Sequence, residues 1–391
     1  MIAVIADDFS GAAELGGIGL RYHLSVEVNT TVNPRTQANV LIIATDARSL
    51  SKQEAVLVMQ KIMQQLVALQ PEMIFKKTDS VLRGHILAEL AAQLPIAQCE
   101  KAVLVPANPT LGRTIQNGRY FLHGQPVHET SFSEDPDFAI TSSVIEDMLQ
   151  VNGHTVHIKK VHEPLPAEGI IVGEATATQD LQAWAARIDH QTLAAGAAGF
   201  FEAILEIKLA GKQPLPNASD LVQHARPFSS TAPSLFVCGS TFANSRQQVQ
   251  QLHAVGGPVS YMPENIMPAD LLGRYSYIKW GDEVTNLIKK YGKAVVAIHP
   301  DTNRQMPVQP VVLRKKMAGL VNEVLQRGLV KELFIEGGAT AWSVVNASGL
   351  TRFFPVQETG AGVVRMCTHG SDLCVTVKPG SYPWPAAMWN F

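Results

Sequence analysis

The stretch IAVIADDFSGA, residues 2–12, decides the fold class. It joins a short apolar run, Ile2 to Ala6, to two carboxylates, and these lead into Ser10 and Gly11 at an expected helix start. A short β-prone run that ends in polar residues before a helix is typical of a mostly parallel sheet covered by helices. The same arrangement recurs along the chain, so the sequence predicts an α/β fold.

Further short apolar runs follow in the first half of the chain and have the same strand-like character. They are Val40 to Ala44, Met73 to Phe75, Lys101 to Val105 and Ile170 to Val172. Between them, Lys52 to Leu69 places its apolar side chains at helical spacing and is predicted to be an amphipathic helix. These runs are the expected strands of the first sheet.

A proline-rich stretch from Gly211 to Pro233 divides the chain, and a second strand-first pattern begins after it. Its expected strands are Leu235 to Cys238, Ala294 to Ile298 and Lys331 to Ile335, and its expected helices are Ala243 to Ala254, Val311 to Gln326 and Thr340 to Ala347. A chain of 391 residues usually needs more than one core. We predict two α/β domains, residues 1–228 and 229–391, each a mostly parallel sheet flanked by helices.

Composition and charge exclude several classes of protein. The chain is 46% apolar and 17% charged, and its net charge of -2 comes from 32 basic and 34 acidic residues that are dispersed along it. Nucleic-acid binders need clustered cations, so we expect no nucleic-acid partner. The four cysteines form no CxxC pair and are expected to be reduced thiols. No secretory leader or membrane span is evident, so we expect a cytoplasmic protein without a membrane partner.

Polar residues that follow the expected strands are candidates for chemistry, because ligands of open α/β sheets bind beyond the carboxyl ends of the strands. Asp7 and Asp8 end the first strand, and either could take a proton from a substrate hydroxyl. Ser10 and the amides near Gly11 could bind an anion. A single Asp here caps a helix about as often as it serves a site, but the pair favours function.

Three more clusters follow in order. In TDARS, residues 45–49, Arg48 could clamp a carboxylate, although a loop arginine is more often a solvated surface group. KKTDSVLRG, residues 76–84, is too rich in charges and hydroxyls for a structural loop and favours a site. PANPTLGR, residues 106–113, ends in Arg113, and a stiff connection and a functional loop are equally good interpretations of it.

DDFSGA, TDARS, KKTDSVLRG and PANPTLGR, in this order and at these spacings, resemble the N-terminal half of the four-carbon acid sugar kinases, a family once known only as a domain of unknown function. The C-terminal half is similar at four short motifs: Cys238-Gly239-Ser240, Ile335-Glu336-Gly337-Gly338-Ala339-Thr340, Thr359-Gly360-Ala361-Gly362 and Lys378-Pro379-Gly380-Ser381. The family usually has Glu where this chain has Ala339, and Asn-Phe-Gly where it has Ser381-Tyr382-Pro383.

The resemblance implies a kinase that phosphorylates the terminal hydroxyl of threonate, erythronate or 3-oxo-tetronate, with ATP and Mg²⁺ as cofactors and the sugar acid and ATP as partners. It implies Asp8, or Asp7 as the alternative, as the proton acceptor or the carboxylate directed at Mg²⁺. The implied acid-binding residues are Asp7, Ser10, Arg48, Lys77, Asp79, Ser80 and Arg83. The implied nucleotide-binding residues are Ser240, Gly337, Gly338, Ala339, Thr340, Gly360, Gly362 and Gly380, where glycines would let amides approach phosphates.

Other interpretations stay open at this point. The chain has no GxxxxGK[ST] loop and no GxGxxG helix start, so a P-loop kinase and a dinucleotide enzyme are disfavoured. His154, His157 and His162 lack the spacing of metal ligands, and no dedicated metal cluster is expected. A metal-dependent sugar-acid aldolase or dehydratase and a non-catalytic sugar-acid or nucleotide sensor are the rivals. A homo-oligomer is compatible with the sequence, which leaves the oligomeric state open.

Overall fold

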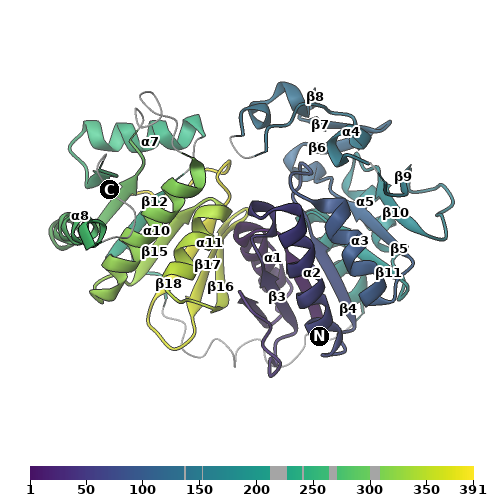
Figure 1. Ribbon diagram of the computed structural model, residues 1–391, viewed down its shortest axis with the longest axis horizontal. Coiled ribbons are helices and arrows are strands. Elements are labelled where there is room, and N and C mark those ends of the chain that lie inside the picture. Colours follow the sequence, from purple (N-terminus) through teal and green to yellow (C-terminus); the bar gives the residue numbers. More distant parts are fainter. Residues whose placement is uncertain (136–137, 152, 212–226, 240–241, 264–270, 300–308) are drawn as a thin grey trace. The chain divides into compact units, whose positions relative to one another are not determined.

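The computed structural model describes residues 1–135, 138–151, 153–211, 227–239, 242–263, 271–299 and 309–391. The chain divides into two compact units, Met1–Ala218 and Ser219–Phe391 (Figure 1). Each unit contains a sheet with helices packed beside it, so the predicted α/β fold class is confirmed. The division lies within residues 212–226, outside the described part of the chain, and the predicted boundary after residue 228 stays a prediction.

The main sheet of the first unit is parallel throughout, with the strand order β2-β3-β1-β4-β11-β5-β10-β9. Its strands are β1 (Ile2–Ala6), β2 (Val26–Asn29), β3 (Val40–Ala44), β4 (Met73–Lys77), β5 (Lys101–Val105), β9 (Val156–Lys159), β10 (Gly169–Gly173) and β11 (Thr192–Gly196). Every residue of β1 and β3 is buried, as expected for apolar strands covered on both faces. All five predicted strands are present.

Six helices accompany this sheet in the described part of the first unit: α1 (Phe9–Arg21), α2 (Lys52–Val67), α3 (Ile86–Ala97), α4 (Ile145–Leu149), α5 (Thr178–Ala185) and α6 (Ala198–Leu209). The predicted amphipathic helix is α2, which starts with a capping box between Ser51 and Glu54. α2 packs on α3, and α6 packs on α1 and α5. Phe75 of β4 contacts Phe200 and Phe201 of α6 and joins the central strand to this second group of helices.

A small antiparallel sheet interrupts the alternation of strands and helices, and the sequence analysis did not predict it. It consists of β6 (Arg113–Gln116), β7 (Arg119–Leu122) and β8 (Gln125–Pro126), followed by the 3-10 turns η3 (Val127–Glu129) and η4 (Ser131–Glu134). Figure 1 shows β6, β7 and β8 close to α4 at one end of the first unit. We call residues 113–135 the inserted segment.

The sheet of the second unit has the order β13-β14-β12-β15-β18-β17-β16. Its strands are β12 (Ser234–Cys238), β13 (Val259–Tyr261), β14 (Lys293–Ala297), β15 (Glu332–Glu336), β16 (Arg352–Gly360), β17 (Val363–Thr368) and β18 (Cys374–Lys378). The three predicted strands pair in parallel, whereas β17 is antiparallel to both β16 and β18. The core includes the stacked rings of Phe236 and Phe334, whose centroids are 4.2 Å apart.

The described helices of the second unit are α7 (Ala243–Ala254), α8 (Leu271–Tyr291), α10 (Pro310–Gln326) and α11 (Gly338–Ala347). Three of them match the predicted helices, and α8 was not predicted. All four cysteines are free thiols. Among the described residues, no helix is long and apolar enough to cross a membrane.

Candidate functional site

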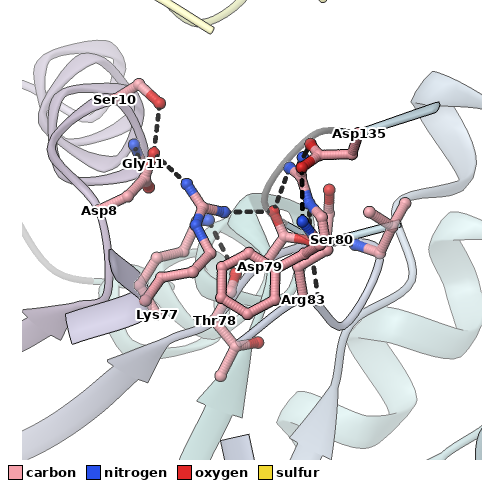
Figure 2. A network of polar contacts seen from close by, with 12 residues as sticks. Asp8, Ser10, Gly11, Lys77, Thr78, Asp79, Ser80, Arg83 and Asp135 are labelled. Carbon is pink, nitrogen blue, oxygen red and sulfur yellow. Dashed lines mark hydrogen bonds and ion pairs between the residues drawn. The ribbon is translucent and has the colours of Figure 1, made fainter. Parts of the chain in front are cut away.

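The predicted polar loops of the first unit meet at one edge of its sheet. β1 lies between β3 and β4, and Ala6 is level with Ala44 and Lys77. Asp7 and the loops that begin at residues 45 and 78 therefore leave the sheet side by side, at the edge where open α/β sheets bind ligands. The sequence clusters become one network of contacts there (Figure 2).

Asp8 is both the cap of α1 and a member of an ion pair. Its Oδ1 accepts a hydrogen bond from the amide of Gly11 at 2.9 Å, and its Oδ2 accepts one from Ser10 Oγ at 2.6 Å. Arg48 Nη2 lies 2.9 Å from the same Oδ2. Burial alone would raise the pKa of Asp8, but Arg48, Lys77 and the two hydrogen bonds outweigh it and lower the pKa. Asp8 is thus a firmly held anion.

Asp79 is the centre of the network. Its Oδ1 accepts hydrogen bonds from Arg48 Nη1 and Arg83 Nη2, each at 2.7 Å. Its Oδ2 accepts hydrogen bonds from Arg83 Nε at 3.0 Å and from the amides of Val81 and Arg83 at 3.1 Å. Burial would raise the pKa of Asp79, but the two guanidinium groups outweigh burial and hold it well below its usual range.

Arg48 joins the two carboxylates, because one of its terminal nitrogens pairs with Asp8 and the other with Asp79. Burial would lower its pKa, but the surrounding carboxylates raise it, and the guanidinium stays charged. Gly84 leaves room for this side chain: a Cβ atom there would lie 3.2 Å from Arg48 Cγ, and its φ of 101° also favours glycine. The last residue of KKTDSVLRG thus shapes the position of an arginine 36 residues earlier in the chain (84 minus 48).

Asp7 differs sharply from Asp8 although the two are adjacent. Its side chain is 2% exposed, and its buried Oδ1 accepts no hydrogen bond from the described residues. Burial raises its pKa to about 6, against the opposing effects of Arg48 and Lys76. Asp7 is therefore the carboxylate of this edge that can exchange a proton near neutral pH.

Lys77 and Lys76 end β4 and have different surroundings. Lys77 Nζ donates to the carbonyl of Thr78 at 2.9 Å and lies close to Gly11, where a Cβ atom would be 3.0 Å from it. Lys76 is buried in an ion pair with Glu89 of α3 at 2.7 Å. Lys77 is thus at the candidate site, whereas Lys76 ties the strand to its covering helix.

The inserted segment supplies contacts that the sequence analysis did not assign to the site. Arg113 Nη1 donates to Ser80 Oγ at 2.8 Å, and Tyr120 Oη donates to the carbonyl of Ser80 at 2.5 Å. Ser80 is therefore fixed through both its side chain and its backbone. The arginine at the end of PANPTLGR was visible in the sequence, but nothing local indicated Tyr120.

Arg83 also reaches the inserted segment. Its Nη1 donates to Asp135 Oδ2 at 2.6 Å, and its guanidinium lies 5.4 Å from the ring centroid of Phe132. The guanidinium of Arg113 lies 5.8 Å from the same ring. Figure 2 shows the network extending from Asp8 through Asp79 and Arg83 to Asp135. Two cations therefore share one aromatic ring beside the polar network.

Among the described residues, the corresponding edge of the second unit contains one buried ion pair. Cys238, Glu336 and Lys378 end β12, β15 and β18 at the same level. Lys378 Nζ lies 3.1 Å from Glu336 Oε1, and both side chains are 1% exposed. Ser245 of α7 also donates to Glu336. Burial lowers the pKa of Lys378, and Glu336 opposes that change.

Glycine turns lie directly beyond this pair. Gly337 has a φ of 90°, its amide donates to the carbonyl of Lys378 at 2.9 Å, and it precedes α11 without providing a side-chain cap. Gly239 approaches Thr340 so closely that a Cβ atom would lie 2.8 Å from Thr340 Oγ1. Among the described residues, no side chain caps the first amides of this ten-residue helix, and anion sites at helix starts use such amides.

The other predicted nucleotide residues are distributed over three places. Gly338, Ala339 and Thr340 form the first turn of α11, and Ala339 is half-buried. Gly380 lies in the turn after β18. Gly360 ends β16, and Gly362, with a φ of 67°, lies in the turn between β16 and β17. Ser240 lies outside the described residues.

Mg²⁺ was predicted as a cofactor without a metal cage made by the protein. Among the described residues, no group of three or more His, Cys, Asp or Glu side chains could hold a metal ion. Mg²⁺ in phosphoryl-transfer enzymes usually needs only one or two carboxylates, with water and substrate phosphates as its other ligands. Asp7 Oδ1 accepts no hydrogen bond from the described residues and is the carboxylate oxygen that fits such an ion, whereas both oxygens of Asp8 already accept hydrogen bonds.

Residues 2–204 match the family described as the sugar-binding N-terminal domain, which is just over half of the chain. The chain belongs to this family. The predicted resemblance to the four-carbon acid sugar kinases is thereby confirmed at the level of the family.

Proteins similar to this chain include kinases of small sugar acids. The D-threonate kinase of Salmonella typhimurium is 30% identical over 234 residues, which are 54% of this chain and 55% of that protein. This match thus spans about half of the relative's length. The D-threonate kinase of Cupriavidus necator is 25% identical over 99% of this chain and 96% of its own. The 3-oxo-tetronate kinase of Methylobacterium radiotolerans is 22% identical over 97% of this chain and 96% of its own.

A crystal structure of a family member from Haemophilus influenzae has the same fold. It matches with a TM-score of 0.68 and 20% identity over 97% of both chains. The fold of the whole chain, and not only the matched N-terminal half, is therefore that of the family.

Proposed function

We propose that this protein is an ATP-dependent kinase that phosphorylates the terminal hydroxyl of a four-carbon sugar acid such as threonate, erythronate or 3-oxo-tetronate. The observation that supports this most directly is the Asp79 network in the first unit. Two arginines, a lysine and two adjacent carboxylates of unlike pKa gather there at the ligand-binding edge of a sugar-binding domain. A negatively charged polyol that must lose one hydroxyl proton needs this combination.

The acid is bound by the first unit in this proposal. Arg83 binds the carboxylate through Nη1, while Asp79 positions Arg83 and Arg48 by accepting hydrogen bonds from both. Ser10, Ser80 and Lys77 bind the hydroxyls or the transferring phosphoryl group. A direct contact between Asp79 and the acid, which the resemblance implied, is less suitable, because five donors already surround the two oxygens of Asp79.

Asp7 is the proton acceptor in this proposal, in preference to Asp8. An acceptor works best when its pKa lies near the working pH, and the pKa of Asp7 is about 6. The pKa of Asp8 is lowered and both its oxygens already accept hydrogen bonds. Asp8 instead holds Arg48 and the start of α1. Mg²⁺, when bound by one of these carboxylates and the phosphates, would neutralise charge on the phosphates.

The nucleotide binds to the second unit in this proposal. The uncapped start of α11, after Gly337, offers backbone amides to a phosphate, and the turn at Gly380 follows the neighbouring strand. The buried pair of Glu336 and Lys378 fixes the ends of the two strands that lead into these turns. Phosphoryl transfer needs mainly positioning and charge, which these parts would supply.

The test is an assay of ADP release by the purified chain with ATP·Mg²⁺ and each of D-threonate, D-erythronate and 3-oxo-tetronate. We expect acid-dependent ADP release with at least one acid, and a product with one added phosphoryl group by mass spectrometry. Release of ADP that does not depend on any acid, or no release by a folded protein, would contradict the proposal. Cleavage or dehydration of an acid without ATP would indicate an aldolase or a dehydratase instead.

A further inference from the structure

Every nitrogen of the Arg83 guanidinium faces a carboxylate of the protein itself. Nε and Nη2 form a two-point contact with Asp79 at 3.0 and 2.7 Å, and Nη1 pairs with Asp135 at 2.6 Å. These contacts use three of the five N–H groups of Arg83, so a substrate carboxylate that pairs with Nη1 from the side of Asp135 has to replace Asp135 there. Arg83 is only 17% exposed in its side chain, so little of it remains for an additional partner.

The two carboxylates differ in the contacts that their displacement would break. Asp79 lies two residues after the end of β4 and accepts hydrogen bonds from two backbone amides in addition to the two arginines, and its side chain is 6% exposed. Asp135 lies in an extended backbone position after η4, its side chain is 14% exposed, and its Oδ1 accepts the amide of Phe138 at 2.8 Å. Displacing Asp79 would also break its ion pair with Arg48, whereas displacing Asp135 leaves the Asp79 contacts intact.

We propose that Asp135 is an internal carboxylate that occupies, on Arg83 Nη1, the position of the sugar acid's carboxylate and is displaced when the acid binds. This inference rests on the proposed function, because it takes Arg83 as the partner of the substrate carboxylate. It makes Asp135 a residue that determines specificity, and not one that takes part in the chemical step.

The exchange would select acids over neutral sugars. A four-carbon acid replaces one charge-assisted hydrogen bond of Arg83 with another of the same kind. A neutral polyol offers only hydroxyls, so its binding in this position would exchange the ion pair of Nη1 for a weaker neutral hydrogen bond. Such a polyol therefore leaves the Asp135 contact in place and cannot occupy the same position.

Phe132 keeps the guanidinium oriented during the exchange. Its ring contacts Arg83 on one side of the network and Arg113 as well, at 5.4 and 5.8 Å. The two-point contact with Asp79 does not involve Nη1. Arg83 can thus change its partner at Nη1 without losing its position.

The test is calorimetric titration of the full chain with D-threonate and with D-threitol, which lacks the carboxylate. We expect Asp135→Asn to bind D-threonate about tenfold more tightly than wild type, because the acid no longer competes with a charged partner. Asp135→Glu retains the competing charge and should stay within about twofold of wild type. D-threitol affinity should be the same in wild type and Asp135→Asn.

The matched control is Glu129→Gln, which removes an exposed carboxylate from the same segment. Its D-threonate affinity should equal that of wild type, so a gain in Glu129→Gln as large as in Asp135→Asn would indicate a general charge effect and overturn the proposal. Circular dichroism checks folding, and Asp135→Ser is a second variant with the same expected gain.

The remaining outcomes separate this inference from the proposed function. Unchanged or weaker D-threonate binding in Asp135→Asn, with clear binding by wild type, contradicts displacement and leaves the kinase proposal standing. If neither wild type nor Asp135→Asn binds D-threonate, D-erythronate or 3-oxo-tetronate, both proposals fail.

Discussion

The two units place different chemistry at the same edge of similar sheets. In the first unit the strand ends lead into charged side chains, and Asp8, Asp79 and Asp135 are all paired with Arg48 or Arg83. In the second unit they lead into one buried ion pair and glycine turns, with an uncapped helix start beyond them. The first edge can recognise a ligand by charge, and the second by backbone amides.

In our proposal, this difference lets one arrangement of strands serve two ligands. A sugar acid is small and varied in its hydroxyls, so side chains are needed to distinguish it. Phosphates are common to all nucleotides, and amides at a helix start bind them without any particular side chain. We therefore ask whether the sugar acid binds at the first edge and the nucleotide at the second.

The largest expected effect is that of Asp7→Asn on turnover. Removing a general base usually lowers kcat by about 10²- to 10⁴-fold, and the KM for ATP should change little because the nucleotide is assigned to the other unit. Steady-state kinetics on the acid that is turned over measures both. Asp180→Asn, which removes a carboxylate at the start of α5, is the control. Wild-type kcat in Asp7→Asn would remove Asp7 from the mechanism.

The second prediction concerns stability. Asp79→Asn leaves Arg48 and Arg83 without their shared carboxylate, and breaking a buried pair in this way usually costs about 3 to 5 kcal/mol. Glu336→Gln leaves one cation, Lys378, and should cost less. Urea unfolding followed by circular dichroism gives both values. A larger loss of unfolding free energy in Glu336→Gln than in Asp79→Asn would contradict this comparison of the two edges.

The third prediction is the pH dependence due to Asp7. Its pKa is about 6 in the folded protein and ordinarily 3.8, so the folded state keeps this proton at pH values where the unfolded state has lost it. The contribution of Asp7 to the free energy of unfolding should therefore fall as pH rises from about 4 to 6, by on the order of 2 to 3 kcal/mol.

Urea unfolding of wild type and Asp7→Asn at pH 4.5 and pH 7 measures this contribution, and Asp7→Asn should gain relative stability at the higher pH. The contribution of Asp79 to the free energy of unfolding changes with pH in the opposite direction. The pKa of Asp79 is held below its ordinary value, so this contribution is lost only as pH falls below about 3.8. A difference between wild type and Asp7→Asn that is independent of pH would contradict the raised pKa.

The smallest expected effect is that of Ala339→Glu in the first turn of α11. A carboxylate near a helix start contributes about 0.3 to 1 kcal/mol, and the family resemblance implies Glu at this position. We expect activity to rise by about two- to fivefold. Ala347→Glu places the same charge at the other end of α11 and should give no such gain. Equal activities of the two variants would show that position 339 has no special role.

The sequence predicted those elements whose pattern is local. β1 and α7 were predicted with the bounds that the structure has, because an apolar run or a helical period is complete within a few residues. β11 was missed because its sequence, TLAAG, contains mostly small residues, and its place between β4 and β5 depends on partners far along the chain. The antiparallel pair β16 and β17 in the second unit was missed as well.

The candidate site likewise contains residues that a local sequence pattern predicts and residues that depend on distant partners. The clusters in KKTDSVLRG and DDFSGA were visible because their charges are adjacent in sequence, and the parallel register of three strands brings them together. Asp135 could not be predicted, since its partner Arg83 is 52 residues away and the connecting sheet had no local pattern. The contrast between the pKa values of Asp7 and Asp8 could not be predicted either. It depends on which of the two adjacent carboxylates the folded chain buries without hydrogen bonds.

The most direct test of the division between the two edges is a pair of calorimetric titrations on Arg83→Ala and Gly338→Val. We expect Arg83→Ala to bind the sugar acid about tenfold or more weakly, because it loses charge-assisted hydrogen bonds, and to bind ATP·Mg²⁺ as wild type does. We expect Gly338→Val to bind ATP·Mg²⁺ more weakly, because the valine side chain obstructs the start of α11, and to bind the sugar acid as wild type does. Loss of ATP affinity in Arg83→Ala together with unchanged ATP affinity in Gly338→Val would contradict the account.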